Sequence, residues 1–85
     1  MSVEDEYYSY LLEKEHQKDT VAKYYMNILR KMFAVGVTEE ELLGDEIDEL
    51  VEDYIKVADI HITNRAKGVY RSVIRRFRVF RGVSE

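Results

Sequence analysis

The chain has 85 residues, of which 46 % are hydrophobic, 35 % charged and 12 % aromatic, and its formal net charge is −4. This describes one small folded domain and excludes a disordered chain. Cysteine is absent and only two histidines occur, which excludes a disulfide framework and an ordinary zinc site. No stretch approaches 18 uncharged apolar residues and the N-terminal segment is acidic, so we expect a cytoplasmic chain with neither a membrane span nor a secretory signal.

The sequence favours an all-α fold, because proline is absent and only four glycines occur. Apolar spacing predicts helices over residues 3–17 and 19–34. Asp19-Thr20 is the expected N-cap of the second helix, and Gly36 is expected to follow its end. Thr38 and Glu41 form a capping-box pattern, which predicts a short helix over residues 38–43.

Two longer helices are predicted in the second half of the chain, over residues 45–58 and 63–81. Thr63 is a plausible N-cap and Gly82 a natural end of the last helix. Gly68 lies inside that helix at a propensity cost near 1 kcal/mol, which indicates either close packing or local weakness. We therefore expect a compact four- to five-helix bundle that forms a single domain over residues 1–85.

Charge is distributed unevenly along the chain. Residues 1–60 contain 16 acids and 6 bases, a local charge of −10, whereas residues 61–85 contain 7 bases and one acid, a local charge of +6. The acids are densest over residues 39–59, where ten acids stand against Lys56 alone. The overall charge therefore conceals two opposite electrostatic poles.

A row of cations follows the helical repeat of the 63–81 helix. Few acids are interspersed, so pairing within the helix is not expected, and arginine suits phosphate oxygens and base edges. Nucleic acid or an acidic protein surface is the favoured partner. The alternative is a solvated face paired with acids elsewhere in the molecule, and ion pairs with the carboxylates of residues 39–59 would remove the case for nucleic acid. The row consists of Lys67, Arg71, Arg75 and Arg78, flanked by Arg65, Arg76 and Arg81.

A second polar strip lies on the 19–34 helix, where Tyr24 is placed to donate a hydrogen bond to a phosphate. The acids of the 45–58 helix are expected to face outward into solvent or toward a partner. The polar strip consists of Thr20, Lys23, Tyr24, Asn27, Arg30 and Lys31.

No catalytic constellation is recognisable in the sequence. His16 and His61 are isolated near helix ends, and the acids of the 45–58 helix lack the spacing of a calcium loop. A glycine-rich phosphate loop, a nucleophile elbow and a metalloprotease pair are all missing. We expect that the chain is not an enzyme by itself and that it uses no cofactor and no metal.

The order of motifs resembles a known family. An amphipathic helix precedes KDTVAKY at 18–24 and ILRKMF at 28–33, and then come IDELVEDYI at 47–55, TNR at 63–65 and VYRSVIRRF at 69–77. Over residues 7–82 this is similar to the N-terminal core-binding domain of phage integrases and other tyrosine recombinases, a SAM-like helical domain. That family shows a Thr-Val-x-x-Tyr opening of its second helix and a Thr-x-x-Arg start to its last helix.

The resemblance implies a module that grips one side of duplex DNA while a separate C-terminal domain, absent from this chain, performs catalysis. It is compatible with a fragment of a longer recombinase or with a stand-alone protein that reuses the fold. A recombinase catalytic domain or another protomer is then a further partner, and no membrane is expected. A self-associating or protein-binding domain that uses its acidic and basic helices is the alternative. The resemblance places Lys23, Tyr24, Asn27, Lys31, Arg71, Arg75 and Arg78 on DNA. The polar strip and the cation row add Thr20, Arg65 and Lys67 to the expected DNA-binding residues.

Overall fold

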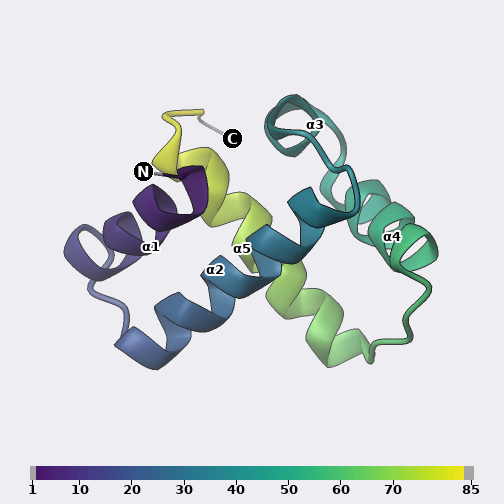
Figure 1. The fold of residues 1–85 in the computed structure, drawn as a ribbon, viewed down its shortest axis with the longest axis horizontal. Helices are drawn as coiled ribbons and strands as arrows, with labels where there is room; N and C mark the ends of the chain where they lie inside the picture. Colours follow the sequence, from purple (N-terminus) through teal and green to yellow (C-terminus); the bar gives the residue numbers. More distant parts are fainter. Residues whose placement is uncertain (1, 84–85) are drawn as a thin grey trace.

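Five α-helices make up the computed structural model, which describes residues 2–83 (Figure 1). The α-helix is the only regular secondary structure in this part of the chain, which confirms the all-α prediction. Met1, Ser84 and Glu85, at the ends of the predicted domain, lie outside the described residues. The helices are α1 (Val3–Glu13), α2 (Asp19–Ala34), α3 (Glu39–Gly44), α4 (Ile47–Ala58) and α5 (Asn64–Phe80).

Local capping interactions begin most of these helices. The Thr63 hydroxyl accepts a hydrogen bond from the Ala66 N–H, and the predicted capping box of Thr38 and Glu41 is present at α3. The predicted cap of α2 was wrong. Its N-cap is Lys18, which makes no side-chain capping bond, and Asp19 is already the first helical residue.

The first helix is shorter than predicted and ends at Glu13, not at residue 17. The Gln17 N–H turns back to donate to the Leu11 carbonyl over 3.0 Å, and His16 adopts a left-handed backbone with φ of 53°. This is the geometry with which many helices end, although glycine usually occupies the left-handed position. Because His16 and not glycine occupies this position, the sequence contained no glycine to indicate the end of the helix.

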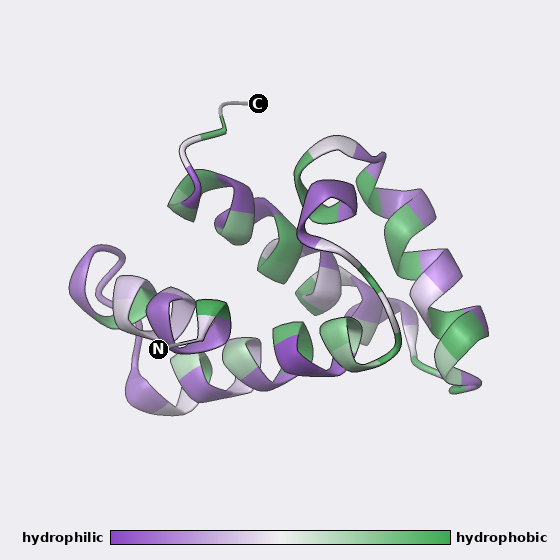
Figure 2. Cartoon of the chain, turned by 45° about the horizontal axis from the view of Figure 1, so that its top comes forward, coloured by the Kyte–Doolittle hydropathy of each residue, from purple (hydrophilic) through white to green (hydrophobic). Residues whose placement is uncertain are grey.

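The helices pack as a crossed pair with neighbours on each side. In Figure 1, α2 passes in front of α5, and α1 lies to one side while α3 and α4 lie to the other. Seen from the second direction, α2 lies below α5, and hydrophobic and hydrophilic stretches alternate along both helices as they turn (Figure 2). Each helix of the pair therefore has its apolar side toward the crossing and its polar side away from it.

The core lies between α2 and α5 and extends toward α1 and α4. Tyr7 of α1 is fully buried in this core and donates a hydrogen bond from its hydroxyl to the Val73 carbonyl over 3.0 Å. The Tyr7 ring meets the rings of Phe77 and Phe80 edge-on at centroid distances of 5.7 and 5.8 Å. The Cα radius of gyration is 12.1 Å, and a compact domain of this length has a radius of about 12 Å. The buried residues are Tyr7, Leu11, Ala22, Ile28, Leu29, Met32, Leu42, Leu50, Val51, Tyr54, Tyr70, Val73, Ile74 and Phe77.

Candidate nucleic-acid interface

The cation row of α5 is largely paired within the molecule. The Lys67 ammonium lies 2.9 Å from a carboxylate oxygen of Glu52, and the Arg71 guanidinium lies 2.6 Å from Asp48. Lys67 and Arg71 are one turn apart on α5, and Asp48 and Glu52 are one turn apart on α4. Because the chain reverses between the two helices, the pairs form two successive rungs.

The same pattern continues toward the end of α5. Arg78 donates hydrogen bonds to the Leu42 carbonyl over 2.6 Å and to the Asp45 carbonyl, both next to or within α3. Arg81 follows with an ion pair to Glu39 at 2.6 Å. We call the contacts of these four residues, Lys67, Arg71, Arg78 and Arg81, the charge ladder. It attaches α5 to α3 and α4 along most of its length.

The charge ladder corrects two of the predictions made from the sequence. The row was expected to be free, but Lys67 and Arg71 are bound to carboxylates of residues 39–59, and Arg78 is bound to carbonyls of the same segment. These are the ion pairs that were expected to remove the case for nucleic acid, and they remove it for the cation row of α5. The acids of α4 were expected to point away, but Asp48 and Glu52 face α5. The physical reason is geometric: the spacing of charges along one helix indicates pairs within that helix, whereas the partners of Lys67 and Arg71 lie on the neighbouring antiparallel helix.

Arg65 and Arg75 remain outside the ladder. Both are exposed, and together with the exposed Val79 we define them as the outer face of α5. Within residues 2–83 neither arginine forms an ion pair. Val79, one turn beyond Arg75, is 56 % exposed. Arg76 turns the other way and pairs with Glu15, which follows α1. The four predicted cations of the row therefore do not share one surface.

The polar strip of α2 stays together in the structure. Every predicted member of this strip is exposed, and Tyr24 is 51 % exposed. Arg30 lies 4.0 Å from Asp5, at the limit of an ion pair, and between exposed side chains such a contact contributes little. We define the outer face of α2 as Thr20, Lys23, Tyr24, Asn27, Arg30 and Lys31.

Asp19 is the carboxylate of α2 and lies at the start of this face. It accepts a hydrogen bond from the Tyr8 hydroxyl and forms an ion pair with Lys23 at 3.1 Å. The hydrogen bond from Tyr8, followed by the interaction with Lys23, lowers the pKa of Asp19 below its ordinary value. The same contacts raise the pKa of Tyr8 and that of Lys23. Asp19 is therefore ionised at neutral pH, and Lys23 stays protonated with its positive charge offset by that carboxylate.

The outer faces of α2 and α5 point in opposite directions. The two helices cross (Figure 1), and both contribute buried residues to the core between them, such as Ile28 on α2 and Val73 on α5. Asn27 and Arg75 are exposed, and each lies on the side of its helix away from these buried residues. The sequence predicted one positive surface that combined both helices. A single straight duplex cannot contact both outer faces at once.

Two further properties bear on function. In the part of the chain that the structure describes, no helix combines the length and apolarity required to cross a membrane. Among the same residues, no group of three or more histidine, cysteine or acidic side chains is arranged to hold a metal ion. Comparisons with protein-family models, curated proteins and solved structures found no match. The resemblance to the core-binding domain of tyrosine recombinases therefore stays a prediction.

Proposed function

We propose that the chain is a DNA-binding module that places the outer face of α2 against the major groove of a duplex. A helix of 16 residues is about 24 Å long at 1.5 Å per residue. The major groove is about 12 Å wide and accepts an α-helix. The proposal is supported by the exposure of this face along the whole helix.

The chemistry of the face fits phosphates at its edges and base edges at its middle. Arg30 and Lys31 supply cations, and Lys18 is exposed just before the helix, whereas Lys23 is already paired with Asp19. Contacts of this kind set position and affinity without reading sequence. Asn27 lies at the midpoint of the face, and an asparagine amide can bind the N6 and N7 edge of adenine with two hydrogen bonds.

The charge ladder changes the set of residues that we assign to DNA. Lys67 and Arg71 already have carboxylate partners, so contact with phosphate would require those ion pairs to break. Arg65 and Arg75 are exposed on the other side of the crossing and do not belong to the same contact. The proposed interface therefore keeps the α2 half of the predicted surface and leaves out the α5 half.

The single observation on which the proposal depends is the exposed, cation-bearing face of α2, in which Asp19 is already paired. The alternative, self-association of the acidic helix with the basic helix of another copy, has less support. The ladder pairs Lys67, Arg71 and Arg81 with carboxylates of the same chain, so these three cations would have to leave their partners to contact another copy.

The proposal is tested by fluorescence anisotropy of a labelled mixed-sequence duplex titrated with the protein. With about three phosphates neutralised, log K should fall with log salt at a slope near −2.7. Lys31→Ala should weaken binding to all sequences alike and reduce that slope by about one. Asn27→Ala should weaken binding chiefly to the preferred sequences, by about 1–3 kcal/mol.

The matched control is Arg71→Ala, which removes the same charge from the ladder. It should leave DNA affinity unchanged once circular dichroism shows that the variant is folded. Failure of the wild-type chain to bind at 50 mM salt would reject the proposal. A large loss in Arg71→Ala with none in Lys31→Ala would move the interface back to α5.

A further inference from the structure

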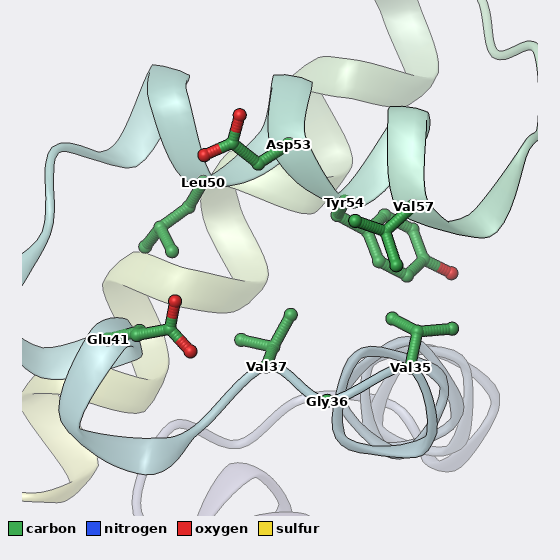
Figure 3. A pocket seen from close by; sticks show the side chains of 8 residues that line it. All are labelled: Val35, Gly36, Val37, Glu41, Leu50, Asp53, Tyr54 and Val57. Atoms are coloured by element: carbon green, nitrogen blue, oxygen red, sulfur yellow. The ribbon is translucent and has the colours of Figure 1, made fainter.

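A cavity opens between α4 and the segment that connects α2 to α3, away from the outer face of α2. Its volume is about 110 Å³. Figure 3 shows α4 on one side and the connecting segment on the other, with Val35 and Val37 pointing across toward Tyr54 and Val57. The lining residues are Val35, Gly36, Val37, Glu41, Leu50, Asp53, Tyr54 and Val57.

Four of the lining residues are aliphatic, and one of these, Val57, is exposed to solvent. Val57 is 65 % exposed, the most exposed large hydrophobic residue among those described. Burial of such a surface by a partner is favourable in proportion to the apolar area removed from water. For scale, an apolar cavity of about 150 Å³ accepts a benzene molecule. A space of 110 Å³ therefore suits one aliphatic side chain.

Acidic groups stand at the edge of this apolar space. Asp48 and Glu52 of α4 are paired in the charge ladder. Asp53 lines both this cavity and a neighbouring groove that it shares with Asp48, Glu52 and Lys56, and within residues 2–83 its side chain has no ion pair or hydrogen-bond partner. Glu41 also lines the cavity, with one carboxylate oxygen accepting from the Thr38 N–H over 2.9 Å.

We propose that this cavity binds one aliphatic side chain of a partner protein segment in which a lysine or arginine flanks that side chain. The occupant follows from charge complementarity at the edge. A neutral or acidic segment would cover Asp53 without compensation, which costs free energy. A flanking cation compensates that carboxylate and disfavours acidic partners. This site is separate from the DNA face and does not depend on it.

The test is a titration of the isotope-labelled chain with short capped peptides, followed by amide chemical shifts. A peptide of alternating leucine and lysine should shift resonances of Val35–Val37 and of α4, and the shifts should shrink as salt is raised. Peptides with glutamate in place of lysine, or with alanine in place of leucine, should bind much more weakly. Val57→Asp should weaken binding about tenfold or more, as expected for loss of a buried aliphatic contact.

Asp53→Lys should remove the preference for lysine over glutamate peptides, and Glu13→Lys on α1 is its charge-matched control. Shifts that map to other surfaces, or equal binding of lysine and glutamate peptides by the wild type, would overturn the proposal. The chain itself carries a cation next to an exposed aliphatic side chain, because Arg75 and Val79 lie one turn apart on α5. A concentration-dependent increase in mass by light scattering that Val79→Asp abolishes would identify a second copy as the occupant and would also overturn it.

Discussion

The ion pair of Arg71 with Asp48 offers the most direct test of how the charges of this chain are arranged. The side chain of Arg71 is 34 % exposed and that of Asp48 is 66 % exposed, so solvent screens the pair. Pairs of this exposure typically contribute about 0.2–1 kcal/mol. In a double-mutant cycle with Arg71→Ala and Asp48→Ala, we therefore expect a coupling free energy of about 0.5–1 kcal/mol.

Charge reversal should enlarge the effect. Arg71→Asp loses the attraction and brings a carboxylate toward Asp48 and Glu52, and we expect a loss of about 1–2 kcal/mol. Total stability for a domain of this size is on the order of 4–13 kcal/mol, so the loss is measurable. The swap Arg71→Asp with Asp48→Arg should recover most of it.

Urea unfolding followed by far-UV circular dichroism is the appropriate assay, because urea leaves ionic interactions unscreened. The coupling should decrease between 0.1 M and 1 M salt, as the screening length falls from about 10 Å to about 3 Å. Arg75→Ala paired with Asp48→Ala is the control and should be additive within about 0.5 kcal/mol. A coupling of zero at low salt, with no rescue by the swap, would refute the ladder in solution and return the cation row to solvent.

Three further predictions concern stability. A Cβ at Gly68 would meet no atom within 4 Å, so the close packing that was one expectation for this glycine is wrong. Gly68→Ala should therefore stabilise the chain by about 0.5–1 kcal/mol, and an unchanged urea midpoint would contradict this gain. Phe77→Ala should cost about 3–5 kcal/mol in thermal unfolding, because its fully buried ring meets Tyr7 and Phe33, whereas the exposed Val79→Ala should cost less than about 0.5 kcal/mol. Burial raises the pKa of Tyr7 above its ordinary value. As pH rises, the Tyr7 hydroxyl therefore loses its proton at a lower pH in the unfolded chain than in the folded chain. Stability should fall above about pH 10, by about 1.4 kcal/mol per pH unit for this group. Tyr7→Phe should reduce that alkaline slope by the same amount, and an identical slope in urea titrations at several pH values would contradict the assignment.

Local features of the sequence were enough to locate most of the helices and the buried stripes. Leu50, Val51 and Tyr54 share one side of the helix predicted over residues 45–58, and all three are buried. The capping box of Thr38 and Glu41 also formed as predicted. These features depend on groups three or four residues apart, which meet in any helix whatever surrounds it.

The candidate interface depended on tertiary structure to a much greater extent. The spacing of Lys67 and Arg71 placed them on one side of a helix, but it could not indicate that Asp48 and Glu52 would come to face them. Nor could it show that the outer faces of α2 and α5 point in opposite directions. The periodicity of a single helix defines an angle about its own axis, whereas the neighbour at that angle is decided by how the helices dock. Contacts between residues far apart in the chain therefore determined which cations are paired internally and which remain available to a partner.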